Sequence, residues 1–186
     1  MRVLHINGDR IVEPTQKSEL LKNRELIFKE HYQTYRKHWY LICLRYQRNN
    51  HNADDALQNG LVKIFKSYHQ FDETKGSFKA WSSKVMVNEN LLLIRKNKSA
   101  FAFDELTDRT DSMDNSETPI DRMSMEELVL MVRKLPAGYR SVFNLYVIEG
   151  YSHKEIAEML NISVGTSKSQ LFKAKKILKS EIEYVF

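Results

Sequence analysis

The sequence predicts an all-α protein made of two small helical domains. Apolar residues recur at helical spacing over about 18–47, 53–68 and 78–95, and helical patterns resume near residue 124. Strand patterns are almost absent. Residues 99–123 are rich in Asp, Ser, Thr and Asn and include Pro119, a composition typical of linkers. We therefore expect domains at 18–98 and 124–186, joined by an acidic flexible linker at 99–123.

Residues 1–17 differ from the rest of the chain. The apolar pairs in Val3–Ile6 and Ile11–Val12 flank Asn7-Gly8, the usual turn of a two-residue hairpin. An isolated hairpin is marginally stable at best, so a flexible tail fits the segment equally well. We assign it no function.

Three helices are expected in the first domain. One face of the first helix carries large apolar side chains, namely Leu21, Phe28, Tyr32, Tyr35, Trp39, Ile42 and Cys43. The polar string NNHN at 49–52 predicts a loop, after which a second helix begins near Ala53. FDETKGS at 71–77 predicts a polar turn containing Gly76, and the third helix follows from Phe78.

The second domain carries the most informative stretch, residues 152–178. Ser152 and Glu155 form a capping-box pattern, in which each side chain satisfies a backbone N–H at a helix start. Asn161-Ile162 interrupts the helical pattern, and Ser163 is placed to cap a second helix running to about Ser180. Two short helices with a tight break predict a helix-turn-helix.

The second of these helices has two chemically different faces. Ser167, Leu171, Ala174 and Leu178 are spaced to line one stripe, which we expect to be buried. Residues 163–180 contain five lysines and no acidic residue. A face of hydroxyls and lysines on the second helix suits the major groove of DNA, and a lysine-rich helix that merely meets water is the alternative.

Charge separates along the chain. Its 186 residues carry a net charge of +5 and a pI near 9.2. Residues 1–100 carry 18 basic and 10 acidic side chains. Residues 101–127 carry 2 basic and 9 acidic side chains, and residues 128–186 carry 9 basic and 5 acidic ones. Two basic lobes around an acidic connector favour a polyanionic partner.

Several other classes of protein are not indicated. Cys43 is the one cysteine, so no internal disulfide forms, and a reducing compartment fits. No apolar run approaches membrane-spanning length, and no secretion signal is seen, so we expect a cytoplasmic protein without membrane insertion. No nucleophile motif or phosphate-binding loop appears, and the histidines lack ligand spacing. We expect no enzyme, no cofactor and no metal site.

These residues together resemble the sigma-70 family of bacterial RNA polymerase initiation factors, and most of all its extracytoplasmic-function (ECF) subfamily. The likeness covers about residues 20–98 and 125–180. In the first domain it rests on Ala53, Asp54, Asp55, Gln58, Phe71, Asp72, Gly76, Phe78, Trp81 and Asn88. In the second it rests on the string LPAGYRSVFNLYVIEGYSHKEIAEMLNISVGTSKSQLFKAKK.

The chain departs from the family pattern in places. Asn59 and Leu61 stand where an acidic and a bulky residue are usual, and Leu92 stands where aspartate is frequent. Ser-Lys-Ser-Gln at 167–170 replaces the frequent Val-Arg-Ser-Arg. Because glutamine prefers adenine where arginine reads guanine, no promoter consensus is carried over.

The resemblance implies a promoter-specificity subunit that directs transcription initiation and assists promoter melting. The second domain, region 4 of the family, would bind the upstream (−35) element. The residues that match its DNA-binding positions are Thr166, Lys168, Ser169, Gln170, Phe172, Lys173 and Lys176. Ser169 offers a hydroxyl to a base edge, Phe172 reaches a thymine methyl, and the lysines pair with phosphates. Packing against the preceding helices is the alternative for Phe172.

The first domain, region 2 of the family, would bind the downstream (−10) element as a single strand. Its expected contacts are Phe71, Lys79, Trp81, Lys84 and Asn88. Asn88 offers a donor and an acceptor to a base edge, in register with an apolar stripe of Trp81, Val85 and Leu92. A buried asparagine bonded to backbone is the alternative for Asn88, and a core position is favoured for Trp81.

The family also implies partners. Asp54, Asp55 and Gln58 would face the β′ clamp of the polymerase core, and the β flap is a second expected contact. In isolation, these residues are also an ordinary acidic first helical turn. An anti-sigma protein is an expected partner on resemblance alone. A helix-turn-helix regulator that binds operators without polymerase remains the alternative function, and it leaves the first domain unexplained.

Overall fold

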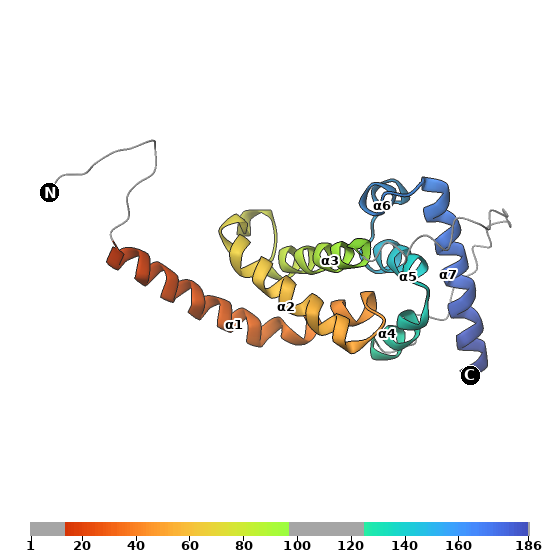
Figure 1. Cartoon of the computed structure of the whole chain (residues 1–186), viewed down its shortest axis with the longest axis horizontal. Coiled ribbons are helices and arrows are strands. Elements are labelled where there is room, and N and C mark those ends of the chain that lie inside the picture. The colour runs from red at the N-terminus through yellow and green to blue at the C-terminus, as the bar shows by residue number, and fades with distance from the viewer. Residues whose placement is uncertain (1–13, 97–124, 186) are drawn as a thin grey trace. The chain divides into compact units, whose positions relative to one another are not determined.

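The computed structural model describes residues 14–96 and 125–185, with side chains over 25–96 and 127–182. Every regular element in these residues is helical, which confirms the predicted class (Figure 1). The chain divides into two compact units, and the boundary lies within the first helix, between Lys37 and His38. The expected hairpin or tail and the linker lie outside the described residues, except that helix α1 (Pro14–Tyr46) begins four residues before the expected start at 18.

The helical part of the first unit is the N-terminal portion of α1, which includes the exposed side chains of Leu26 and Ile27. The second unit, residues 38–186, contains two groups of helices. We call residues 38–96 the N-terminal bundle and residues 125–185 the C-terminal bundle.

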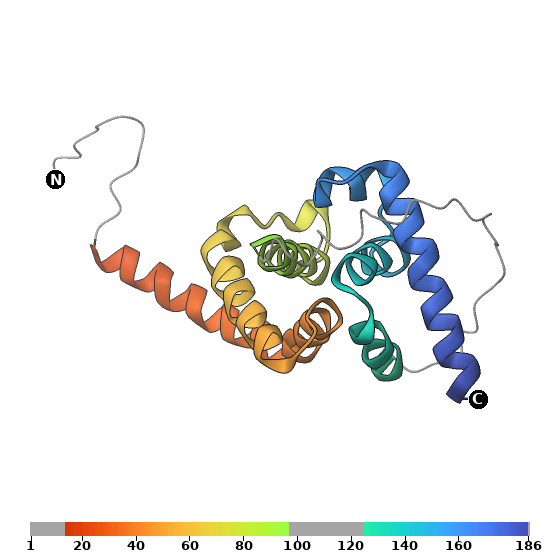
Figure 2. The same cartoon turned by 45° about the vertical axis from the view of Figure 1, so that its right-hand side comes forward.

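The N-terminal bundle combines the end of α1 with α2 (Asn50–Ser67) and α3 (Phe78–Lys96). Two short 3₁₀ turns, η1 (Tyr68–Gln70) and η2 (Glu73–Lys75), connect α2 to α3. Helices α2 and α3 pack against each other, and Figure 2 shows α3 nearly end-on beside α2. Large buried core side chains of this bundle include Trp39, Ile42, Tyr46, Ile64, Met86 and Leu91.

Helix α2 starts earlier than the sequence predicted, because the expected loop at 49–52 is mostly helical. Asn49 lies in extended backbone and its side chain accepts a hydrogen bond of 2.8 Å from the backbone N–H of Asn52. Asparagine is among the best residues at this capping position. With Asn49 as the cap, residues 50–52 of the polar string form the first turn of α2.

The C-terminal bundle contains α4 (Met125–Lys134), α5 (Ala137–Phe143), the π-helical turn η5 (Asn144–Ile148), α6 (His153–Leu160) and α7 (Val164–Val185). Helix α7 packs against α5 and α6, whose ribbons lie beside it in Figure 2. The core is formed by side chains from each helix, including Val132, Val142, Phe143, Leu145, Ile156, Ala174 and Leu178.

The helix-turn-helix has the capping that the sequence predicted. The backbone N–H of Ser152 donates to Glu155 Oε2 at 2.8 Å, and the backbone N–H of Glu155 donates to Ser152 Oγ at 3.3 Å. Asn161 ends α6 in the left-handed conformation, with φ 54°. Ser163 Oγ then accepts from the backbone N–H of Thr166 at 2.9 Å, which caps α7. The turn is therefore held by local side-chain bonds.

Candidate nucleic-acid interface

Helix α7 presents the predicted two faces. Ser167, Leu171, Ala174 and Leu178 are all buried, so the apolar stripe is the packing face. On the opposite side Lys168, Ser169 and Lys176 are exposed, while Thr166, Phe172 and Lys173 are half-buried. Thr166 Oγ1 already lies 2.8 Å from Ser163 Oγ, at the cap. The most accessible hydroxyl and charges are therefore those of Lys168, Ser169 and Lys176.

Gln170 does not lie on this exposed face. Its side chain is 3% exposed and packs against Gly138 of α5, where a Cβ would come within 3.0 Å of the amide nitrogen. Its Oε1 has no hydrogen-bond partner among the described residues. Gln170 borders the buried stripe, and the missing side chain at Gly138 leaves room for it. The expected base contact from Gln170 does not fit this burial.

Lys173 and His153 add aromatic contacts that the sequence did not indicate. Lys173 Nζ lies 6.0 Å from the ring centre of Tyr139, within cation–π range. The ring of His153 stacks on that of Tyr146 at 4.5 Å, and its Nδ1 lies 2.9 Å from Ser167 Oγ. Burial, with the nearby lysines, lowers the pKa of His153, so the ring is neutral at pH 7.

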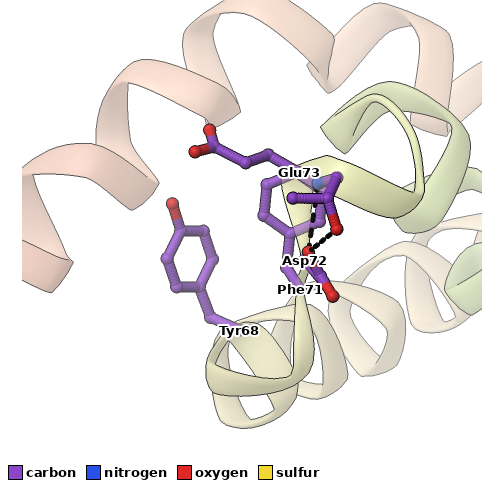
Figure 3. Close-up of a pocket in the computed structure, with 5 residues that line it drawn as sticks. Tyr68, Phe71, Asp72 and Glu73 are labelled. Atoms are coloured by element: carbon purple, nitrogen blue, oxygen red, sulfur yellow. Dashed lines mark hydrogen bonds between the residues drawn. The ribbon is translucent and has the colours of Figure 1, made fainter.

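A second candidate site lies at the turns between α2 and α3. Tyr68, Phe71, Asp72, Glu73 and Thr74 line an open cavity of about 410 Å³ (Figure 3). Asp72 Oδ1 accepts from the backbone N–H of Thr74 at 3.0 Å and from its hydroxyl at 2.6 Å. The pKa of the Asp72 carboxyl is lowered, first by the hydrogen bond from the Thr74 hydroxyl. Lys75 Nζ, which lies 3.2 Å from Asp72 Oδ2, and the Thr74 N–H lower it further. The carboxylate is therefore used to hold the loop in shape.

Aromatic rings support the cavity. Phe78 is buried, and the Phe71 ring meets it edge-on at 5.3 Å. Trp81 lies 5.6 Å from Phe71 and 5.5 Å from Phe78. Both Phe71 and Trp81 are half-buried, so each combines ring contacts in the bundle with partial exposure. Trp81 is thus neither fully in the core nor free at the surface.

Asn88 lies at the surface of α3, along with Lys79 and Lys84. Its stripe of Trp81, Val85 and Leu92 also meets solvent, since Leu92 is 43% exposed. The alternative of a buried asparagine is therefore excluded for Asn88, and Asn90 occupies that role instead. Asn90 is fully buried and donates to the backbone carbonyl of Met86 at 2.9 Å.

The outer face of α2 is polar and accessible. Asp54, Asp55 and Gln58, the residues expected to contact polymerase, are exposed. Val62, one turn further along, is 53% exposed. The face therefore combines two carboxylates with an apolar side chain, which suits a protein partner better than DNA.

Within the described residues, no three His, Cys, Asp or Glu side chains gather in a way that could hold a metal ion. None of the helices in that part of the chain has the length and apolar character to cross a bilayer. Cys43 is buried, and burial raises the pKa of its thiol to about 11.

Comparison with known proteins gives matches to both bundles. A family model for sigma-70 region 2 matches residues 31–100, and a model for sigma-70 region 4 matches residues 125–178. The ECF RNA polymerase sigma factor SigM of Bacillus subtilis is 27% identical over 81% of this chain and 92% of its own. The ECF RNA polymerase sigma factor SigW of the same organism is 28% identical over 80% of this chain and 84% of its own.

Two solved structures are also similar. Sigma factor RpoE in complex with the anti-sigma factor NepR, from Bartonella quintana, aligns over 84% of this chain and 96% of its own, with 18% identity and a TM-score of 0.49. CnrH in complex with the cytosolic domain of CnrY aligns over 86% of this chain and 90% of its own, with 19% identity and a TM-score of 0.45.

A helix-turn-helix bundle preceded by a helical bundle of the region 2 type defines a transcription initiation protein. The chain belongs to the sigma-70 family of RNA polymerase sigma factors, and its curated relatives are factors of the ECF subfamily. This family consists of regulatory polymerase subunits.

Proposed function

We propose that the protein is a promoter-specificity subunit that brings bacterial RNA polymerase to a promoter in the cytoplasm and helps to open it, without catalysing covalent chemistry. The observation that carries the proposal is the match of both bundles, in order, to region 2 and region 4. A regulator that binds operators alone would not need the region 2 bundle. We assign region 2 to about 18–98 and region 4 to about 124–186.

In this proposal α7 lies in the major groove of the −35 element. Lys168 and Lys176 neutralise phosphates, with Lys173 as a third cation held beside Tyr139. Ser169 is the exposed hydroxyl that reaches a base edge. Phe172 and Thr166 are half-buried and lie at the margin of this contact. In this proposal upstream recognition uses fewer base contacts than the sequence suggested, because the side chain of Gln170 is buried.

The cavity at 68–74 and the exposed face of α3 capture the −10 element as single strand. Extruding a base costs a few kcal/mol of stacking and pairing, which the protein must offset. Phe71 and Tyr68 supply aromatic surface at the cavity, and Asn88 offers donor and acceptor groups on α3. Lys79 and Lys84 follow the strand's phosphates. Trp81 packs beside Phe71 and is itself half-buried.

Polymerase binding is assigned to α2. Asp54, Asp55 and Gln58 face the β′ clamp, and Val62 adds apolar area to the same surface. The C-terminal bundle is the expected contact of the β flap. An anti-sigma protein is a further proposed partner, on the likeness of the chain to factors of the ECF subfamily.

A single assay tests the proposal. Purified protein and core polymerase are added to promoter DNA that carries a fluorescent base at the −10 element. We expect a fluorescence rise that requires the protein, the core enzyme and an intact −10 sequence together. Tight binding to duplex DNA by the protein alone, with no opening after core enzyme is added, would support the operator-binding regulator instead.

A further inference from the structure

An open cavity of about 420 Å³ is lined by three cations and one apolar side chain, namely Arg48, Leu130, Arg133 and Lys134. Arg48 lies between α1 and α2, and the other three residues belong to α4. None of these lining residues is acidic. The volume falls within the range of small-molecule sites, about 300–1,000 Å³. The lining therefore favours a small anionic ligand.

The positive charge at the cavity is only partly balanced by carboxylates. Two salt bridges start from the same helices, Arg45 of α1 with Glu149 and Lys134 of α4 with Glu181, the latter at 2.7 Å. Neither Arg48 nor Arg133 forms a salt bridge with a carboxylate in the described part of the chain. Two guanidinium groups at the cavity therefore keep their full charge.

Arg133 is held in place by neutral groups. Its Nη2 donates to Asn50 Oδ1 at 2.7 Å and to the backbone carbonyl of Arg48 at 3.5 Å. Its Nε has no hydrogen-bond partner among the described residues. Because a guanidinium group has five N–H donors, these bonds orient Arg133 and leave other donors for a ligand.

Arg140 adds a buried positive charge close to the cavity. It is 4% exposed, and it donates to the backbone carbonyls of Tyr46 at 2.9 Å and Arg133 at 3.1 Å. Burial, with repulsion from Arg48 and Arg133, lowers the pKa of Arg140 to about 10, so the group is still charged at pH 7. Three like charges thus lie close together, and an anion bound beside them would relieve their repulsion.

From this lining we propose that the cavity binds the phosphate groups of a small nucleotide, a nucleoside di- or triphosphate. Arginine matches phosphate oxygens with two parallel N–H bonds, and Arg48 and Arg133 supply two such groups. Leu130, which is 60% exposed, offers an apolar surface to the sugar or the base. An inorganic phosphate would leave that surface uncovered. The inference goes beyond the proposed function and does not depend on it.

The cavity is separate from the surface proposed for the −35 element. Lys134 contacts Glu181, near the C-terminal end of α7. Ser169 lies about 18 Å away along that helix, at about 1.5 Å per residue. Lys176 is nearer, but at about 100° per residue it lies about 140° around the helix from Glu181. The carboxylate of Glu181 also repels a DNA backbone. These features favour a free nucleotide over a DNA phosphate.

Isothermal titration of the full chain with ATP, GTP and pyrophosphate, in buffer without magnesium, tests the site. We expect one nucleotide to bind per chain. Pyrophosphate should bind at least about fivefold more weakly, because it cannot cover Leu130. The titration needs neither promoter DNA nor polymerase. No binding at millimolar nucleotide, or equal affinity for nucleotide and pyrophosphate, would overturn the proposal.

Arg48→Glu is the sharpest variant, because the Arg48 side chain is exposed and its loss removes no bond that holds the fold. Reversing this charge should weaken ATP binding at least about tenfold. Arg48→Lys keeps the charge but loses the planar fork, so its affinity should lie between those of the parent and Arg48→Glu. Arg36→Glu makes the same charge change at an exposed arginine of α1 and should bind ATP as the parent does.

Leu130→Ala separates a nucleotide site from a general attraction for anions. The side chain is largely exposed, so its truncation should leave the fold intact. We expect ATP binding to weaken several-fold while pyrophosphate binding stays unaltered. A variant that weakens both ligands equally, or neither, would contradict the assigned apolar contact.

The remaining controls distinguish the source of the phosphate. Excess duplex carrying the −35 element should leave ATP binding unaltered, and displacement of ATP by the duplex would assign the cavity to DNA instead. An equal loss of affinity in Arg36→Glu and Arg48→Glu would reduce the site to diffuse attraction. Circular dichroism checks that each chain is folded, and Arg48→Gln, which removes the charge without reversing it, serves if Arg48→Glu does not fold. It too should weaken ATP binding, and unchanged affinity would refute the site. Promoter opening is measured separately, so either proposal can fail alone.

Discussion

Gln47 Nε2 donates a hydrogen bond of 2.9 Å to Asn90 Oδ1 in the core between α1 and α3. Asn90 Nδ2 in turn donates to the backbone carbonyl of Met86 and to the sulfur of Cys43. Asn88, two residues earlier, is exposed to solvent. Two neighbouring asparagines on one helix therefore have separate roles, one in holding α1 to α3 and one at the proposed DNA surface.

Replacing Asn90 by alanine should destabilise the N-terminal bundle. The change leaves the buried amide of Gln47 without its acceptor and creates a small cavity, so we expect a loss of about 1–3 kcal/mol in the free energy of unfolding. Urea denaturation followed by circular dichroism measures it. Asn88→Ala is the matched control and should lie within about 0.5 kcal/mol of the parent. Equal losses in both variants would contradict these assignments.

The same Asn88→Ala chain should be defective in promoter opening. If Asn88 reads a base only after strand separation, its loss weakens the open complex and leaves initial duplex binding unchanged. The fluorescent-base assay gives the opening, and gel mobility at low temperature gives the closed complex. A base contact of this kind is worth about 1–3 kcal/mol, or roughly 5-fold to 150-fold in the opening equilibrium. Equal impairment of both steps would remove Asn88 from the base-reading surface.

Removing a lysine from α7 should change the salt dependence of upstream binding. Lys173→Ala is expected to weaken binding to a −35 duplex uniformly across sequences and to reduce the slope of log K against log salt by about 1. Titrations at several salt concentrations give this slope. Lys63→Ala, an exposed lysine on α2, removes the same charge from the other bundle and should leave the slope unaltered. An unaltered slope in Lys173→Ala would mean that Lys173 does not neutralise a phosphate of the −35 element.

The capping box at the start of α6 makes a prediction about stability. Ser152→Ala removes the acceptor for the N–H of Glu155 and the hydroxyl that lies 2.7 Å from its carboxylate. We expect the C-terminal bundle to lose about 1 kcal/mol of stability. Thermal melting measures the loss, and Ser180→Ala, at an exposed site on α7, serves as control. A melting temperature that is unchanged by Ser152→Ala would show that α6 is held by packing alone.

Local signals predicted the fold well. The capping pair Ser152 and Glu155, the break at Asn161 and the buried stripe on α7 all depend on contacts within a few residues, and each is present in the structure. The early start of α2 was missed because a row of polar residues indicates a loop as readily as a helix cap. The cap at Asn49 decides between them.

The site was harder to predict because burial depends on distant partners. Helical spacing groups Asn88 with Trp81 and Leu92, but packing against α1 and α2 decides which face of α3 is covered. Gln170 is buried because Gly138, on another helix, leaves it space. The bonds from Arg140 and Asn144 to the end of α1 join residues 94 and 99 positions apart, and no local pattern indicates them.

Glu149 gives the protein a pH-dependent stability whose sign can be worked out. Burial raises the pKa of its carboxyl, and the opposing effect of Arg45 is smaller. The folded chain therefore binds a proton that the unfolded chain, with an ordinary pKa of about 4.3, has already lost. This contribution favours folding at low pH and fades as the pH rises through the interval between the two pKa values. Above that interval the charged carboxylate lowers stability.

Glu149→Gln should therefore raise the stability at pH 7 and flatten its dependence on pH, because the amide resembles the protonated acid and still accepts a bond from Arg45. Urea midpoints from pH 4 to pH 8 measure both effects. Glu158→Gln changes the same charge at an exposed site and should follow the parent. A lower midpoint at pH 7 in Glu149→Gln would mean that attraction to Arg45 exceeds the cost of burying the carboxylate, and the assigned direction of the pKa would be wrong.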